Sequence, residues 1–332
     1  MRAKAFFING GAGRVICSIP AFVKYAETHD DFIIVCEGGM NFYKAHPVLH
    51  KYAFDNWHKN LFEDYLKSRD CVTPEPYRQW HYYNQKCNIA QAFDMEINGI
   101  AEPRELPSPS IKLSKTEAIT ALNTIEEIKN VTGKDKVVVF QPFGRGVQVE
   151  QEYIIDPSSR SFHTTHAVDL INNLRKDYAV VIMSEFQFQI GEQDPPVAWP
   201  QADIRVWAGI IQNADHFVGC DSVGQHIAKS TETSVTAVIG STYPVNISYP
   251  EDSTFDIIDV GENDRTFSPI RLTMEDYQDM MNDECMNMSK DVYDKVVSSC
   301  RKRLGKPKFR DVKKEPQKVM TPSCCEPKGF GK

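Results

Sequence analysis

The chain contains 332 residues, of which 41% are hydrophobic and 25% are charged, and its net charge is −7. These values are ordinary for a globular protein with a large buried core, and no apolar run is long enough to cross a bilayer. The nine cysteines are scattered through predicted helices and strands, which favours reduced thiols in a cytoplasmic protein, with no metal site expected. The N-terminus enters a strand pattern directly, so no signal peptide is expected.

The N-terminal segment predicts a parallel strand–helix–strand unit. The apolar stretch 5–8 is typical of a buried strand, the glycine-containing stretch 9–13 of a loop, and the stretch 14–27 of a helix that Pro20 interrupts. A second buried strand at 32–36 completes the unit.

The loop of this unit begins like the fingerprint of dinucleotide-binding proteins. Gly11 and Gly13 fit that fingerprint, but Ile16 stands where its last glycine belongs. Glu37, at the end of the second strand, is placed to hold a ribose hydroxyl. An NAD- or FAD-dependent oxidoreductase therefore stays open as an alternative function, carried by an incomplete motif.

The next segment, residues 40–110, is dense in aromatic residues with interleaved histidines and lysines. Residues 87–97 predict a helix that ends at a glycine cap, and the proline-rich stretch 102–109 predicts a linker. Ser114 and Glu117 form the pattern of a capping box, which opens a further helix.

A second series of strands and helices then begins. A strand at 136–140 is followed by a glycine loop, a helix at about 166–175 and a strand at 179–183 that ends beside Glu185. A further helix and strand follow over 204–217. The order of elements predicts two α/β units in tandem, each beginning with a strand and a glycine loop.

The stretch 218–228 carries the strongest local signal for a ligand. An apolar strand ends in a small polar loop, and a helix opens with His226 on its first turn. Free backbone N–H groups and the positive dipole end at such a helix start suit phosphate, although the same residues also fit a simple N-cap and a buried histidine. A second buried strand at 235–240 ends in the polar loop 241–244. Because α/β folds bind ligands at the carboxyl edge of the sheet, a nucleotide-type ligand is expected.

The second half of the chain resembles the donor domain of the lipopolysaccharide (ADP-heptose) heptosyltransferases, which are GT-B-fold glycosyltransferases that use nucleotide-sugars. Asp221-Ser222 and the turn 240–244 are similar to that family's Asp-Ser/Thr loop and Gly-x-Thr-x-Pro turn. The matching stretches are 137–144, 160–162 and 208–250, with a looser likeness at 13–20. The resemblance implies two Rossmann-like domains facing a central cleft, with a nucleotide-sugar as donor and no required cofactor.

Carried over residue by residue, the resemblance implies a donor site built from strand-end loops. Glu185 would lie at the nucleoside ribose, and Arg160 would stand where the family has a phosphate-binding cation. Helix amides and cations of this kind stabilise charge on a departing diphosphate without a metal. The other expected donor-binding residues are Gly11, Gly13, Gln141, Gly144, Asp221, Ser222, Val223, Gly224, His226 and Thr242.

The residues do not identify the catalytic base. The family carries an aspartate after the N-terminal glycine loop, whereas this chain has Arg14, which cannot act as a base near neutral pH. Arg14 instead fits a phosphate contact, and Glu37, His81 and Asp94 are the candidates for the base. A retaining reaction that needs no such base, and loss of activity, both stay open.

The predicted domains are an acceptor-side domain over residues 1–130 and a donor domain over 134–270. A C-terminal helix over 271–300 is expected to pack back toward the first domain. Residues 301–332 hold 11 Lys or Arg and three acidic residues, a net charge of +8 against −15 for residues 1–300. This composition predicts a mobile basic tail, of the kind that contacts polyanions or keeps a terminus soluble.

These observations predict a glycosyltransferase that moves a hexosyl, heptosyl or pentosyl group to a hydroxyl, most simply of a saccharide such as a lipopolysaccharide core. The aromatic segment, the basic tail and the missing aspartate leave a second acceptor open. This acceptor is a hydroxymethylated base in DNA, modified by a viral enzyme in the host cytoplasm. A non-catalytic relative that acts as an interaction protein is a further alternative.

Overall fold

The computed structural model describes residues 2–150, 153–191, 195–265 and 285–310. Its first half contains a four-stranded sheet in the order β3–β2–β1–β4, with every pair parallel. The strands are β1 (Lys4–Ile8), β2 (Phe32–Cys36), β3 (Ala53–Asp55) and β4 (Asp70–Val72). The predicted strand–helix–strand unit at the N-terminus is therefore present.

Helix α1 (Ala12–Ala26) connects β1 to β2 and packs against α3 (Ile89–Asn98). It starts two residues before the predicted start and continues through Pro20, which is buried inside it. Helix α3 ends at the predicted cap, where Gly99 adopts a left-handed conformation. The aromatic-rich segment between them forms short helices: η1 (Met40–Tyr43), η2 (Phe62–Leu66), η3 (Pro76–Arg78) and α2 (Trp80–Tyr83).

The second half contains a five-stranded parallel sheet in the order β11–β10–β9–β5–β8. Most of its strand residues are fully buried, as expected for a parallel sheet covered on both faces. An antiparallel hairpin, β6 (Gln148–Glu150) and β7 (Tyr153–Ile155), lies outside this sheet. The sheet strands are β5 (Val137–Gln141), β8 (Ala179–Ile182), β9 (His216–Gly219), β10 (Val235–Ile239) and β11 (Phe255–Asp259).

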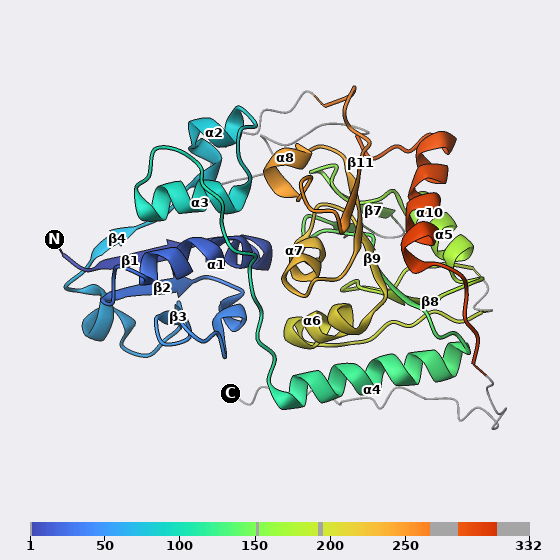
Figure 1. The fold of residues 1–332 in the computed structure, drawn as a ribbon, viewed down its shortest axis with the longest axis horizontal. Coiled ribbons are helices and arrows are strands. Elements are labelled where there is room, and N and C mark those ends of the chain that lie inside the picture. Colours follow the sequence, from blue (N-terminus) through green and yellow to red (C-terminus); the bar gives the residue numbers. More distant parts are fainter. Residues whose placement is uncertain (1, 151–152, 192–194, 266–284, 311–332) are drawn as a thin grey trace.

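Helices cover the second sheet and include one that was expected in the first domain. The helices are α4 (Lys115–Thr132), α5 (Thr164–Leu174), α6 (Ile204–Asn213), α7 (Val223–Ser230), α8 (Pro244–Ile247) and α10 (Lys290–Leu304). Helix α4, opened by the predicted capping box, packs against α6 along the lower edge of the second half (Figure 1). A Cβ at Gly209 would lie 2.6 Å from Ala121 Cβ, so only glycine permits this close approach. The first half therefore ends before α4 rather than at residue 130.

The C-terminal helix also differs from expectation. Helix α10 packs on α5 and on strands β9, β10 and β11, so it covers the second sheet rather than returning to the first half. The described part of the expected tail is attached to the fold: Leu304 is buried and Arg303 pairs with Asp256. Arg310 contacts Glu126 and Asp135. Residues 271–284 and 311–332 lie outside the described residues.

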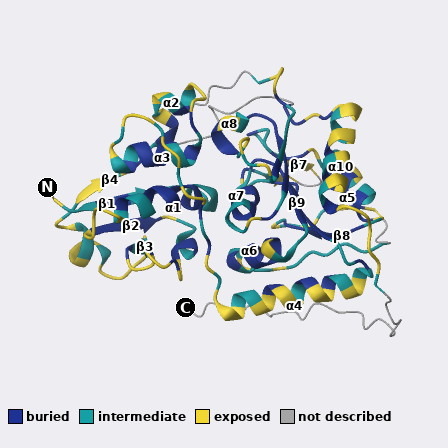
Figure 2. Cartoon of the chain, viewed as in Figure 1, coloured by how far each residue is buried: buried dark blue, intermediate teal, exposed yellow. Residues whose placement is uncertain are grey.

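The hydrophobic core is continuous between the two halves. One cluster joins Phe6 and Val15 of the first half to Val137 and Ile227 of the second, and the opposite face of the second sheet has its own cluster around Phe140. Figure 2 shows the buried strands and inner helix faces, with an exposed outer face on α4. None of the helices in the described ranges is long and apolar enough to span a membrane.

Candidate active site at the facing carboxyl edges of the two sheets

The carboxyl ends of the two parallel sheets face each other. The N-terminus of α1, which follows β1, meets the N-terminus of α7, which follows β9. A Cβ at Gly13 would lie 3.3 Å from the His226 ring, and a Cβ at Gly11 would lie 3.8 Å from the guanidinium of Arg145. The two halves therefore touch at this point, and the approach is tight at Gly13, whereas Gly11 has room for an ordinary contact.

Gln141 joins the end of β5 to the start of α7. Its side-chain Nε2 donates to Ser222 Oγ at 3.1 Å, and its Oε1 accepts from the backbone N–H of Gly224 at 2.9 Å. A Cβ at Gly224 would collide with that oxygen and with the Phe217 ring. The backbone N–H of Gly224, one of the α7 amides that were expected to bind phosphate, is thus already bonded to Gln141. The side chain of Ser222 does not cap the helix. The adjoining Val223 is the first residue of α7 and lies next to Gly13.

Asp221 ties the loops after β9 and β10 together. Its buried carboxylate accepts from Thr242 Oγ1 at 2.8 Å and from Gln225 Nε2 at 3.2 Å. Asp221 also acts on Arg160: burial lowers the pKa of this guanidinium, but Asp221 and Asp156 raise it above its ordinary value. The carboxylate of Asp221 therefore organises the site, and Arg160 keeps its charge beside it.

His226 faces the first half rather than the loop between β9 and α7. Its Nδ1 lies 2.9 Å from Tyr249 Oη and 3.5 Å from Cys17 Sγ on α1. Burial lowers the pKa of His226 to about 4 and raises the pKa of Cys17 to about 12. At neutral pH the imidazole and the thiol are both uncharged, so His226 is not a cation for a diphosphate and Cys17 is not a thiolate nucleophile.

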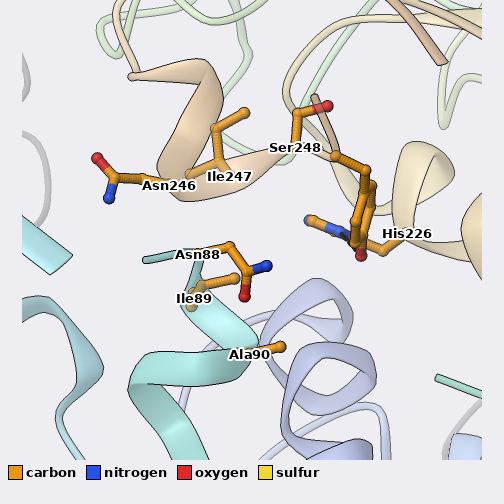
Figure 3. Close-up of a pocket in the computed structure, with 8 residues that line it drawn as sticks. Asn88, Ile89, Ala90, His226, Asn246, Ile247 and Ser248 are labelled. Carbon is orange, nitrogen blue, oxygen red and sulfur yellow. Dashed lines mark hydrogen bonds between the residues drawn. The ribbon is translucent and has the colours of Figure 1, made fainter. Parts of the chain in front are cut away.

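Beside His226 is a small pocket between α3 and α8 (Figure 3). Asn88, Ile89 and Ala90 line it on one side and Asn246 to Ser248 on the other. Asn246 Nδ2 donates to the backbone oxygens of Tyr82 at 2.7 Å and Cys87 at 2.9 Å, so α8 is bonded to the first half. The empty space is about 160 Å³, part of it open to solvent, against roughly 300–1,000 Å³ for small-molecule sites. This pocket is therefore part of the contact surface between the two halves.

Three arginines lie near the facing edges. Arg14, on the first turn of α1, has a buried side chain whose guanidinium lies 5.0 Å from the ring centre of Tyr77 and 3.7 Å from Glu75 Oε1. Arg145, in the loop after β5, is exposed next to Gly11. Arg160 is half-buried, and its Nε donates to Ser158 Oγ at 2.9 Å. Nearby, the Gly144 N–H donates to Ser161 Oγ at 2.9 Å.

The other expected residues divide into two groups. Glu37 and Glu185 are exposed just after β2 and β8, at the same edges of their sheets. His81 and Asp94 lie on α2 and α3 and bind the connecting segment instead: His81 Nε2 is 3.1 Å from Glu102, and Asp94 accepts from Arg104 at 2.7 and 3.0 Å. Asp94 is fully buried in this ion pair, an environment that is typical of a structural role.

The sequence reasoning missed Glu75 and Tyr77, which follow β4 at the same edge. The only available signal was β4 itself, a three-residue strand whose first two residues are exposed, and it lacks the apolar run that marks buried strands. Within the described parts of the chain, no three His, Cys, Asp or Glu side chains gather as a metal site. The expectation that no metal is required stays a prediction.

Neither a family profile nor a curated protein sequence matches this chain. Solved structures do. A glycosyl transferase family 9 protein from Veillonella parvula superposes with a TM-score of 0.61 and 10% identity, over 91% of this chain and 97% of that one. The ADP-heptose lipopolysaccharide heptosyltransferase II of E. coli gives a TM-score of 0.50 and 10% identity, over 91% and 100%.

The iron-containing dodecameric glycosyltransferase TibC from enterotoxigenic E. coli is also similar. Its TM-score is 0.55 at 10% identity, over 91% of this chain and 78% of that one. At 10% identity, these similarities show the fold alone. The chain has the α/β fold, with parallel sheets, of the family 9 glycosyltransferases and heptosyltransferases, as its resemblance to them predicted.

Proposed function

We propose that this protein is a glycosyltransferase that moves a sugar from a nucleoside-diphosphate donor to a hydroxyl group. The observation that carries the proposal is the cluster of Arg14, Arg145 and Arg160 at the facing carboxyl edges, next to the start of α7. Guanidinium groups are suited to binding phosphate oxygens, and α/β folds bind ligands at the carboxyl ends of their strands. TibC, which shares the fold, has been solved in complex with ADP-D-beta-D-heptose.

The chemistry of transfer fits these residues. When the bond between the sugar and the diphosphate breaks, negative charge develops on the diphosphate oxygens. Arg160 is held in place by a hydrogen bond to Ser158 and by the charges of Asp156 and Asp221. It can therefore stabilise the negative charge on the diphosphate without rearranging. Arg145, on the neighbouring loop, is exposed and free to close on the ligand. We include in the proposal that these cations, and not a metal, stabilise the leaving group.

For the acceptor we propose a saccharide. The neighbours of the same fold include an enzyme named for lipopolysaccharide. The DNA alternative draws on the basic tail, but three tail arginines are already paired within the fold. Arg301 pairs with Asp177, Arg303 with Asp256, and Arg310 with Glu126 and Asp135. Fewer unpaired cations are therefore available to bind a polyanion than the sequence predicts.

A cytoplasmic location belongs to the same proposal. The seven cysteines in the described part of the chain are all free, and six of them are buried. Burial raises the pKa of several of these thiols, including Cys36 and Cys220, and keeps them unreactive. Such a set of free thiols is typical of a reducing compartment.

Thermal denaturation of the full chain with ADP, UDP, GDP or NAD tests the donor site. We expect one diphosphate to raise the melting temperature and NAD to leave it unchanged. R160Q and R145Q are expected to lose most of the shift. R2Q is the matched control that keeps it, because Arg2 lies at the amino end of β1, beside Asp70. Stabilisation by NAD alone, or by no nucleotide at all, would contradict the proposal.

Transfer is then tested with sugars attached to the nucleotide that stabilises the protein. Release of the free nucleoside diphosphate is measured with a lipopolysaccharide-core saccharide and, separately, with duplex DNA containing hydroxymethylated cytosine. Release that depends on the saccharide supports the proposed acceptor. Release that depends on the DNA overturns the acceptor while leaving the transferase activity in place.

A further inference from the structure

A groove runs between α5 and α10, on the side of the second half that lies away from the first half (Figure 1). Its water-accessible space is about 520 Å³, within the range of roughly 300–1,000 Å³ that small-molecule sites occupy. Among the described residues that line it, none belongs to the arginine cluster or to the start of α7. The groove is therefore separate from the facing edges of the two sheets.

Side-chain contacts near both ends of the groove hold its two helices together. Near the start of both helices, His166 Nε2 accepts from the backbone N–H of Met288 at 3.2 Å. Near their ends, Arg301 Nη2 donates to Asn173 Oδ1 at 3.0 Å. The two helices therefore run side by side in the same direction, and the fold itself sets the shape of the groove.

An asparagine that lines the groove has an unpartnered atom. Asn172 Oδ1 is buried and has no hydrogen-bond partner within the described residues, whereas the same atom of the adjacent Asn173 is bonded to Arg301. Buried polar atoms are nearly always bonded. Because an amide oxygen only accepts, the group that completes this site has to bring an N–H or O–H to it.

The charged side chains of the groove are exposed and spread along its length. Lys290 lies near the start of the helices and Lys176 near the other end. Asp169 lies between them, at the level where its backbone oxygen accepts from Tyr293 Oη at 3.0 Å. From this register the two lysines are ~15 Å apart along the helix axes. A compact anion cannot reach both lysines and is repelled by Asp169, so the arrangement favours an extended ligand with donors and acceptors.

We propose that this groove binds a short oligosaccharide. Hydroxyl groups both donate and accept, so one ligand can donate to Asn172 and Asp169 and accept from Lys176 and Lys290. The ring of Tyr293 lines the same groove and offers an apolar surface to a sugar ring. The site is distinct from the donor site, and the proposal does not depend on the transferase function.

A peptide suits the groove less well. Extended and helical peptides dock mainly through the edge of a sheet or through apolar grooves. The groove lies between two helices, and the described residues that line it include a single aliphatic side chain, that of Met288.

Isothermal titration calorimetry of the full chain with maltotriose, chitotriose and a lipid-free lipopolysaccharide-core oligosaccharide tests the groove. At least one of the three is expected to bind. N172L is expected to raise the Kd at least about tenfold, because a sugar hydroxyl loses its buried acceptor. The variant should fold, since leucine has a similar shape and carries no unpartnered oxygen. N123L, at an exposed position of α4, is the matched control and should bind as wild type does.

Hydrogen–deuterium exchange then locates the bound oligosaccharide. Protection is expected over residues 164–176 and 290–301, with no change at 219–226. If N172L does not fold, K176Q is measured instead and is expected to weaken binding several-fold.

No binding of any of the three oligosaccharides, equal Kd values for wild type and N172L, or protection confined to the facing edges would overturn the proposal. Binding of inorganic phosphate that is lost in N172L would also overturn it, because the groove would then be an anion site. The melting shift produced by a nucleoside diphosphate should be the same in N172L and wild type, so failure of the donor site and failure of the groove are separate results.

Discussion

The backbone N–H of Gly224 donates a 2.9 Å hydrogen bond to Gln141 Oε1, so the last residue of β5 holds the first turn of α7. This contact joins positions 83 residues apart and sets where the α7 N-terminus points. It also explains why glycine is required in the second position of the helix, since any side chain there would collide with Gln141 and Phe217.

Replacing Gly224 with alanine should destabilise the protein. The added Cβ forces Gln141 or the buried Phe217 ring to shift, and we expect a loss of about 1–3 kcal/mol in the free energy of unfolding. Urea denaturation followed by circular dichroism measures this loss. G144A is the control, because a Cβ there would lie at ordinary contact distances of 3.7–3.8 Å. Equal midpoints for G224A and wild type would count against the described contact.

His226 should make stability depend on pH. Its folded-state pKa is lowered from 6.5 to about 4 by burial, so the unfolded chain binds a proton more readily. The contribution is present above pH 6.5 and is lost as pH falls through the window from 6.5 to 4. The expected loss is about 3 kcal/mol. Comparing unfolding free energies of wild type and H226Q at pH 8 and pH 4 isolates it, and H29Q, at an exposed histidine, should leave the pH dependence as in wild type.

Asp94 should prove structural. Removing its charge in D94N weakens the pair with Arg104 that holds the segment after α3, and we expect a loss of about 2 kcal/mol in stability. Arg104 is partly exposed, which keeps the loss below that of a fully buried pair. The kcat of folded D94N should remain within a few-fold of wild type. A large loss of kcat with unchanged stability would restore Asp94 as a candidate base.

The end of α10 should behave as core and not as tail. Leu304 is 2% exposed, and L304A should cost about 2–4 kcal/mol in unfolding free energy. K302A, at an exposed position two residues earlier on the same helix, should change stability by less than about 0.5 kcal/mol. Chemical denaturation of both variants settles whether the fold extends past residue 300.

Removal of metal ions should not affect turnover. The proposed stabilisation of the diphosphate rests on Arg145 and Arg160, so dialysis against EDTA is expected to leave kcat unchanged while R160Q lowers it. Restoration of lost activity by added divalent cations, after EDTA treatment, would assign the charge stabilisation to a metal.

Much of the architecture follows from local patterns. The apolar runs at β1, β2, β5 and β10, the capping box at Ser114 and the glycine cap at Gly99 act through neighbours within a few residues, so the residues alone predict them. The loop within 218–228 and the loop 241–244 were expected at the carboxyl edge of the sheet for the same reason. The packing of α4 on the second half and the attachment of α10 to the second sheet were not predictable, because they depend on contacts between elements distant in the sequence.

The sequence by itself determined that two series of parallel strands end in loops with glycines and hydroxyl groups, which suit a phosphate-bearing ligand. This was possible because strand and loop preferences depend on residues that are close together in the sequence. Only the tertiary structure decided what those loops face. It places His226 next to Cys17, and it pairs Asp94 with Arg104 and Asp221 with Thr242. It also places Glu75 beside Arg14, in the loop after a strand that is too short to be predicted from the sequence. Such pairings join residues tens to hundreds of positions apart, and they are set by packing of the whole core rather than by any local pattern.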